Sequence, residues 1–216
     1  MKYKLVAFDV DGTLVDEIVY IWPLLHKGLG ADPEKVESAS RRFYSGEITF
    51  RQWAEYDTGL WIEREATRDR ILEIISGLKP MPGSLETLNE LKQRGFKLAA
   101  ISGGLDIVME EIIPESRILF SHMLINRLIF DESGRLTGLE PNDYGDDGSK
   151  DIGLELIAEK EGISMEECVF IGDSVNDMSI MKAAGLGIGF MPHKKLETVC
   201  DVVIKKKDLR EILRHL

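Results

Sequence analysis

Two aspartates near the start of the chain, Asp9 and Asp11, have the spacing of a shared acidic site. They follow an apolar run typical of a buried strand, and a glycine and a threonine come directly after them. Residues two apart on an extended chain point to the same side. Two carboxylates that close raise each other's pKa, and a divalent cation would relieve their repulsion. The alternative is a polar turn after a strand, which this stretch alone does not exclude.

Later polar stretches follow predicted strands or begin predicted helices, and each supplies a different chemical group. Asp173 and Asp177 add hard oxygen ligands of the kind that Mg²⁺ prefers. Ser102 and the amide of Gly103, expected at a helix N-terminus, predict an anion-binding site. Lys150 adds a positive charge. A metal site, an anion site and a carboxylate nucleophile together predict phosphoryl transfer.

The elements that must position these residues indicate an α/β fold. From Ser84 onward, apolar strands alternate with amphipathic helices, as in a doubly wound, Rossmann-like parallel sheet. In such a sheet the carboxyl ends of the strands meet at one edge, where ligands bind, so the polar stretches are expected to converge there. The predicted strands are 3–8, 96–101, 168–171, 186–190 and 202–204, and a hairpin is predicted from 123–130 and 135–139.

Residues 17–79 have a different pattern, that of consecutive helices with no convincing strand. Asp32-Pro33 and Thr49 are predicted helix starts. We therefore expect a core domain of residues 1–16 and 80–216, and a small helical cap domain of residues 17–79 inserted after the first strand. The aromatic residues of the cap are expected to form mainly its own core, with a substrate pocket as the alternative. They are Tyr44, Phe50, Trp53, Tyr56 and Trp61.

The composition is that of an acidic globular protein, with 216 residues, a net charge of −11 and two cysteines. This charge argues against binding to nucleic acid or to an anionic membrane, so the expected partner is a small molecule. No apolar run approaches the ~18 residues of a transmembrane helix, and the chain begins with a strand rather than a signal segment. Two cysteines form no disulfide framework, so a reducing, cytoplasmic setting fits.

In their order along the chain, the motifs resemble those of the haloacid dehalogenase superfamily of phosphohydrolases. The motifs are Asp-x-Asp-Gly-Thr at 9–13, hydrophobic-Ser-Gly at 101–103, a lysine at 150 and Gly-Asp-x-x-Asn-Asp at 172–177. Within the superfamily, the chain is most similar to the phosphoserine phosphatase group in the stretch at 101–104, the hairpin and the C-terminal tail. The resemblance covers the core and, more loosely, the cap.

The resemblance implies a Mg²⁺-dependent phosphomonoester hydrolase that works through an aspartyl-phosphate. Asp9 would be the nucleophile, and Asp11 would protonate the leaving alcohol and then activate water. Asp9, the main-chain carbonyl of Asp11, and Asp173 would bind Mg²⁺. Asp177 would adjust the metal shell or hold Lys150 in place.

The same resemblance assigns the residues that bind the substrate. Those expected to hold the transferring phosphoryl group are Thr13, Ser102, Gly103 and Lys150. Asn176 would contact the substrate or orient Ser102.

The substrate itself is less defined by the resemblance. In phosphoserine phosphatases an acid near the first motif and an arginine on a cap helix bind the ammonium and carboxylate of phosphoserine. Here the acidic position falls on Ile18, with Glu17 beside it, and the arginine position falls on Asp57. An aspartate cannot replace an arginine that faces a carboxylate. Either Glu17 and another arginine bind phosphoserine in a shifted register, or the substrate is a related phosphomonoester. Glu17 and Asp57 are therefore the candidate specificity residues.

Two other classes of protein also use an aspartate that accepts a phosphoryl group, and they are the alternatives to a phosphatase. A phosphotransferase or mutase of the same superfamily passes the phosphoryl group to an alcohol instead of water. A receiver-like signalling protein also has a phosphorylatable aspartate and a lysine, but it is about half as long, has no cap and lacks the Gly-Asp-x-x-Asn-Asp motif.

Overall fold

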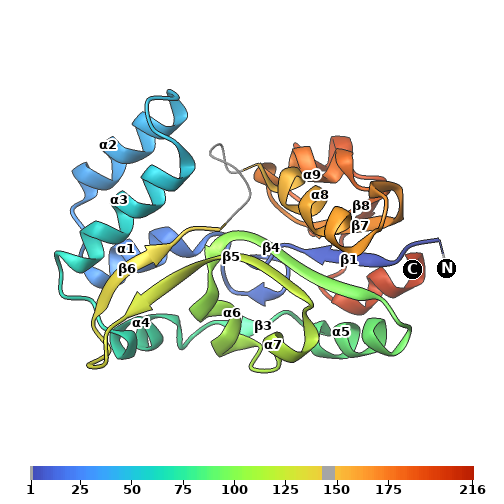
Figure 1. Cartoon of the computed structure of the whole chain (residues 1–216), viewed down its shortest axis with the longest axis horizontal. Helices are drawn as coiled ribbons and strands as arrows, with labels where there is room; N and C mark the ends of the chain where they lie inside the picture. The colour runs from blue at the N-terminus through green and yellow to red at the C-terminus, as the bar shows by residue number, and fades with distance from the viewer. Residues whose placement is uncertain (1, 143–148) are drawn as a thin grey trace.

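A computed structural model describes residues 2–142 and 149–216 of the chain. Its main sheet consists of β1 (Leu5–Phe8), β4 (Lys97–Leu105), β5 (His122–Phe130), β6 (Leu136–Glu140), β7 (Cys168–Gly172), β8 (Leu186–Phe190) and β9 (Val202–Ile204). Within the described residues these strands lie in the order β6-β5-β4-β1-β7-β8-β9 (Figure 1). The β5–β6 hairpin is antiparallel and the other neighbours are parallel. The predicted α/β class and the predicted hairpin are confirmed.

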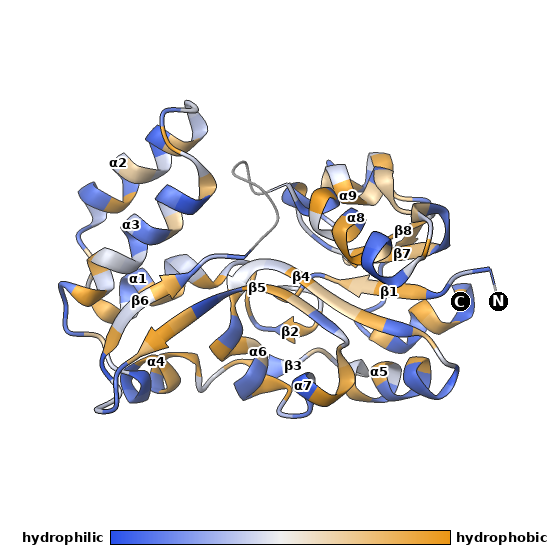
Figure 2. Cartoon of the chain, viewed as in Figure 1, coloured by the Kyte–Doolittle hydropathy of each residue, from blue (hydrophilic) through white to orange (hydrophobic). Residues whose placement is uncertain are grey.

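Helices cover both faces of this sheet. In Figure 1, α8 (Lys150–Glu161) and α9 (Met178–Ala183) lie on one side, and α5 (Ser84–Gln93), α6 (Asp106–Ile112) and α7 (Ser116–Leu119) lie on the other. The residues of β1 divide accordingly, with Leu5 and Ala7 in one apolar cluster and Val6 and Phe8 in the other. Because successive strand residues point to opposite faces, β1 is buried on both sides, and Figure 2 shows it as hydrophobic throughout.

The segment between β1 and α5 contains the helices α1 (Ile21–Leu29), α2 (Pro33–Tyr44), α3 (Phe50–Ile62) and α4 (Arg68–Ile75). Two predicted helix starts are confirmed, because Asp32 accepts from the N–H of Glu34 and Thr49 forms a capping box with Gln52. A short antiparallel pair that was not predicted, β2 (Val15–Asp16) and β3 (Lys79–Pro80), joins the two ends of the segment. In the part of the chain that the structure describes, no helix is both long and apolar enough to cross a membrane.

The β5–β6 hairpin extends along this helical segment and is hydrogen-bonded to it. Arg68 N donates to Gly134 O at 2.8 Å, and Leu136 N donates to Ala66 O at 2.9 Å. Between these bonds, Thr67 and Arg135 form an antiparallel bridge. We call this contact the hairpin junction. It links the helical segment to the sheet through the main chain, at a place far from β2 and β3 (Figure 1).

The structure corrects one predicted element that matters for the site. Ser102 and Gly103 do not open a helix, because β4 continues through Leu105 and α6 begins at Asp106. The pairing of β4 with β5 shifts register between Ser102 and Leu105, as at a β-bulge. Glycines are favoured at bulges, where the backbone bends. The expected anion-binding groups therefore lie at an irregular strand end rather than at a helix N-terminus.

Candidate active site

The acids of the predicted site converge at the carboxyl ends of β1 and β7. Asp9 directly follows β1 and Asp173 directly follows β7. With Asp177, they place carboxylate oxygens within 4.8 Å of one another. Asp11 is buried on the loop after β1, and it lines the same cavity as Asp9.

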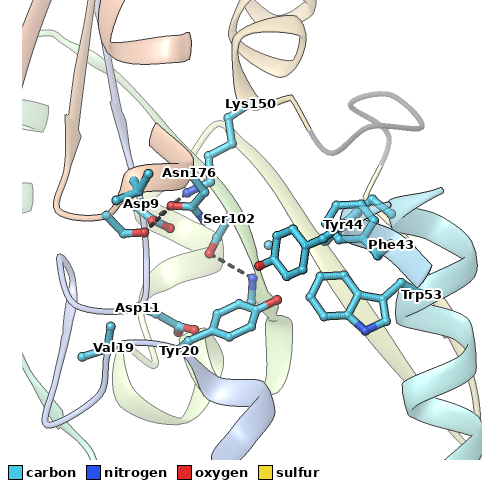
Figure 3. Close-up of a pocket in the computed structure, with 15 residues that line it drawn as sticks. Asp9, Asp11, Val19, Tyr20, Phe43, Tyr44, Trp53, Ser102, Lys150 and Asn176 are labelled. Atoms are coloured by element: carbon cyan, nitrogen blue, oxygen red, sulfur yellow. Dashed lines mark hydrogen bonds and ion pairs between the residues drawn. The ribbon is translucent and has the colours of Figure 1, made fainter. Parts of the chain in front are cut away.

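Lys150, the first residue of α8, supplies a positive charge among these acids. Its Nζ lies 2.6 Å from Oδ2 of Asp9 (Figure 3) and 2.7 Å from Oδ1 of Asp177. The lysine is only 2% exposed. Oδ2 of Asp177 accepts from the main-chain N–H groups of Asp173 and Ser174, each at 3.1 Å. Asp177 therefore positions Lys150 and orders the loop after β7.

Burial and mutual repulsion change the acidity of the cluster. Burial, followed by the charges of Asp9 and Asp177, raises the pKa of Asp173 to about 8. Burial likewise raises the pKa of Asp177 to about 6, although Lys150 opposes the shift. Three carboxylates facing one ammonium leave an excess of negative charge, and a divalent cation with a preference for oxygen ligands would balance it. The acidic cluster therefore fits a metal ion.

Asp11 has one hydrogen-bonded oxygen and one free oxygen. Oδ2 accepts from the N–H of Ile21, the first residue of α1, at 2.9 Å. Oδ1 is buried and has no hydrogen-bond partner among the described residues. Burial and the charge of Asp9 raise the pKa of Asp11 to about 7, against the opposing effects of the Ile21 N–H and Lys150. Such a carboxyl can donate and regain a proton near neutral pH.

Two side chains that the sequence analysis did not assign to the site hold the end of β4. Gly103 O accepts from Trp22 Nε1 at 2.9 Å and from Asn126 Nδ2 at 3.0 Å. The same Asn126 nitrogen lies 3.1 Å from Gly104 O. These bonds fix the peptide planes at the strand end, since each peptide unit is rigid. One signal was present in the sequence: Asn126 is a polar residue within the apolar run of a buried strand.

Ser102 is held from two sides. Asn142, a third residue that the sequence analysis did not assign to the site, donates from Nδ2 to Ser102 O at 3.2 Å and so fixes the peptide that carries the Gly103 N–H. Gly104 N donates to Ser102 Oγ at 3.1 Å (Figure 3). A Cβ on Gly104 would lie 3.2 Å from both carboxylate oxygens of Asp11 and from Ser102 Oγ. The absence of a side chain there lets the strand approach Asp11 closely.

A cavity of about 410 Å³ opens beside these groups (Figure 3). The predicted site residues that line it are Asp9, Asp11, Ser102, Gly103, Lys150 and Asn176. The helical segment contributes Val19, Tyr20, Phe43, Tyr44, Phe50 and Trp53. The interpretation of the cap aromatics as mainly core was therefore wrong for Tyr44 and Trp53, which line the cavity without being fully buried. It holds for Trp61 and for Phe50, which are buried, although Phe50 also lines the cavity. Tyr56 is partly exposed and does not line the cavity.

Two predicted substrate-binding residues have other partners in the structure. Thr13 is buried and donates from Oγ1 to Oδ1 of Asp173 at 2.9 Å, so it positions a carboxylate of the acidic cluster. Asn176 lines the cavity, and its Oδ1 accepts from Ser174 Oγ at 2.5 Å. The prediction that Asn176 contacts the substrate fits this position better than the prediction that it orients Ser102.

The two candidate specificity residues do not line the cavity, which corrects the prediction. Glu17 is exposed and lies in the left-handed region with φ 65°. Asp57 is buried, with Oδ2 3.1 Å from His26 Nε2. Because Trp61 Nε1 donates to His26 Nδ1 at 3.0 Å, the histidine carries its proton on Nε2 and donates to Asp57. Asp57 thus belongs to a polar cluster inside the helical segment.

Comparison with known proteins defines the family. A family model described as haloacid dehalogenase-like hydrolase matches residues 3–185. The chain therefore belongs to the haloacid dehalogenase-like hydrolase family, as its motifs predicted. This result does not favour the receiver-like or the phosphotransferase alternative.

Several relatives of known name resemble the chain over its whole length. A phosphoserine phosphatase of Methanocaldococcus jannaschii is 34% identical, over 100% of this chain and 98% of the relative. A phosphoserine phosphatase solved in a substrate-bound complex has a TM-score of 0.77 at 32% identity, covering 100% of this chain and 99% of the other. A phosphoserine phosphatase solved as a phospho-aspartyl intermediate analogue has a TM-score of 0.75 at 33% identity, covering 100% of both chains.

Proposed function

We propose that this chain is a Mg²⁺-dependent phosphomonoester hydrolase that forms an aspartyl-phosphate on Asp9. One observation carries the proposal: a buried carboxylate, a carboxyl with a pKa near 7 and a buried lysine all line one cavity. These are the parts that nucleophilic phosphoryl transfer needs. The resemblance to a phosphatase solved as a phospho-aspartyl intermediate analogue supports the same chemistry.

The reaction has two halves that balance in protons. In the first, a carboxylate oxygen of Asp9 bonds to phosphorus, the bond from phosphorus to the ester oxygen breaks, and the leaving alcohol takes the proton of Asp11. In the second, water attacks phosphorus and gives a proton to Asp11, and the bond from Asp9 to phosphorus breaks to release phosphate. Asp11 ends protonated, as it began, which is the cycle that a pKa near the working pH permits.

The remaining groups hold the phosphoryl oxygens. Ser102 Oγ, the Gly103 N–H and Lys150 lie around the same cavity and offer donors to an anion. Asp177 and Asp9 keep the Lys150 ammonium at the centre of the site. Asn176 stands at the rim, where it would contact the substrate.

The metal ligands we propose are Asp9, Asp173 and the main-chain carbonyl of Asp11. When bound there, Mg²⁺ would neutralise charge on the phosphoryl group and reduce its repulsion from the carboxylates. Asp177 is already bonded to Lys150 and to two amides, so we assign it to the surroundings of the metal rather than to its ligands.

The substrate class that we propose is a small phosphomonoester. Phosphoserine is one candidate, because the relatives are phosphoserine phosphatases. The setting that we propose is cytoplasmic, in keeping with two free cysteines.

The test is phosphate release in the presence of Mg²⁺ from a panel of phosphomonoesters that includes phosphoserine. We expect Asp9→Asn to lower kcat by roughly 10³-fold or more, as loss of a nucleophile does. The matched control is Asp69→Asn, a change at an exposed acid of α4. Release that persists undiminished in Asp9→Asn would refute the mechanism. Phosphate transfer to added glycerol in place of release would identify a phosphotransferase.

A further inference from the structure

The cavity has two chemically different ends. Its phosphate end holds the acids, Ser102 and Lys150, whereas its outer end is bounded by aromatic side chains of α2 and α3. Figure 3 shows Phe43, Tyr44 and Trp53 across the cavity from Ser102 and Asn176. A phosphomonoester with its phosphoryl group at Asp9 would therefore present its alcohol part to these rings.

The rings pack into one continuous aromatic surface, from which the phenol oxygen of Tyr44 points toward the cavity (Figure 3). Phe43 and Trp53 are stacked, with centroids 4.5 Å apart and an interplanar angle of 21°. Tyr44 lies 5.9 Å from Trp53 at 59°. Because the rings pack against one another, they do not stand apart as the walls of a cage around a cation. The indole Nε1 of Trp53 is buried and has no hydrogen-bond partner among the described residues, so this ring offers the cavity only carbon atoms.

Charged groups are absent from the outer end among the described residues. The charged side chains that line the cavity are Asp9, Asp11 and Lys150, all at the phosphate end. Glu17 and Asp57 are not part of the lining. A carboxylate on the aromatic surface would gain no partner of opposite charge, and an ammonium would gain only the weaker attraction of a ring face.

We propose that the preferred substrate is the phosphate ester of an uncharged alcohol that carries an aromatic or bulky apolar group. This group lies on the surface of Phe43, Tyr44 and Trp53, while the phosphoryl group occupies the site of Asp9 and Lys150. The inference rests on the proposed function and specifies its substrate class. Burial of apolar area on the rings supplies the selectivity.

The test compares esters that share a primary-alcohol leaving group: ethyl phosphate, 2-phenylethyl phosphate, phosphoserine and phosphocholine. With the full chain and Mg²⁺, we expect kcat/KM for 2-phenylethyl phosphate to exceed that for ethyl phosphate and phosphoserine by about tenfold or more. The ratio of kcat/KM between 2-phenylethyl and ethyl phosphate should fall toward one in Trp53→Ala. It should fall also in Tyr44→Ala, and because Tyr44 is 78% exposed we expect this variant to keep its fold. The control is Tyr56→Ala, a change at an aromatic residue that lies on α3 with Trp53 but outside the cavity, which should keep the ratio.

The outcomes separate this inference from the proposed function. Equal or faster turnover of phosphoserine would overturn the inference and leave the hydrolase proposal standing. A preference for phosphocholine would identify the rings as a cation site and would also overturn the inference. If none of the esters released phosphate, or if Asp9→Asn released it equally well, the proposed function would fail and the inference with it.

Discussion

Asp11 and the glycines around it illustrate how single residues determine the site. Gly12 has φ 77°, and a Cβ there would lie 2.5 Å from Oδ2 of Asp173, so both its conformation and its lack of a side chain are required. Gly104 does not have a positive φ that would require glycine, but a Cβ there would lie only 3.2 Å from oxygens of Asp11 and Ser102. The close approach desolvates Asp11, and burial is the main reason that its pKa rises to about 7.

Gly104→Ala tests this close approach. The added methyl would lie 3.2 Å from both oxygens of Asp11, which must shift to relieve the contact. We expect kcat to fall by roughly 10- to 100-fold, the effect of a small misplacement of reacting groups. The measurement is steady-state phosphate release together with a thermal melt.

The control for that variant is Gly59→Ala, where a Cβ would meet nothing within 4 Å. Because Gly59 lies inside α3, alanine should stabilise the helix by up to about 1 kcal/mol and leave turnover unchanged. A Gly104→Ala enzyme with normal kcat would show that the spacing between Gly104 and Asp11 is not critical.

Among the elements, α1 is in direct contact with the reacting groups. Its first N–H donates to Asp11 Oδ2, and its Trp22 donates to the carbonyl of Gly103. Asn126, on β5, bonds to that same carbonyl. A helix of the segment after β1 and a strand of the sheet therefore jointly fix the end of β4, where the phosphoryl group is expected.

Asn126→Ala tests the contribution of β5. The change leaves Gly104 O without its Asn126 donor and frees Asn142 N, which now donates to Asn126 Oδ1 at 3.0 Å. We expect the free energy of unfolding to fall by about 1–3 kcal/mol, the cost of buried polar groups left unsatisfied. We also expect KM to rise, because the donors at Ser102 and Gly103 lose their fixed positions. Denaturant melts and steady-state kinetics measure the two effects.

Asn89→Ala is the matched control. Asn89 also donates from Nδ2 to a carbonyl, that of Leu85, but it lies on the exposed side of α5. Water can replace that bond, so stability and KM should stay nearly constant. Equal effects of the two substitutions would mean that Asn126 has no special role.

The elements also show where sequence reasoning succeeds. Strand runs such as Cys168–Gly172 were predictable because a parallel strand buried on both faces is continuously apolar. The helix starts at Pro33 and Phe50 were predictable because Asp32 and Thr49 carry the side-chain caps. The continuation of β4 through Gly103 was not, because Ser-Gly-Gly fits a helix cap, a tight turn and a strand bulge equally well.

The residues of the predicted cap show a second case in which the sequence did not predict the structure. Counting along the chain placed Asp57 opposite the substrate, but the side chain turns inward to His26. The direction of a helix face depends on which neighbours it packs against, and this is a tertiary property. The cap aromatics were assigned mainly to the core, with the pocket as the alternative, because a ring at helical spacing fits a core and a pocket wall alike.

On the scale of the whole molecule, the protein has a net charge of −11 and concentrates buried acids at one edge of its sheet. Without a metal ion these acids oppose folding. The pKa of Asp173 is raised from 3.8 to about 8, so between those pH values the folded protein holds a proton that the unfolded chain has lost. The free energy of unfolding of the metal-free protein therefore falls as pH rises through this window.

Mg²⁺ should oppose this loss of stability, because it should stabilise the folded protein more strongly as pH rises. The ion competes with protons for the carboxylates, so its binding should strengthen from pH 6 toward pH 8, the range over which Asp177 and Asp173 lose their protons. We expect excess Mg²⁺ to raise Tm more at the upper pH than at the lower, as measured by differential scanning fluorimetry. Asp173→Asn should abolish the difference. An equal Tm shift at both pH values would exclude Asp173 as a ligand that titrates in this range.

The hairpin junction limits which segments can be exchanged between relatives in a chimera. Because Arg68 and Leu136 bond across it through main-chain groups, the helical segment and the β5–β6 hairpin must match in shape as well as in side chains. A chimera that receives residues 17–79 from a relative should melt below both parents, and it should recover when residues 126–140 come from the same donor. The substrate range would then depend on two segments that are distant in sequence, residues 17–79 and 126–140, and a change of substrate would require exchanging both.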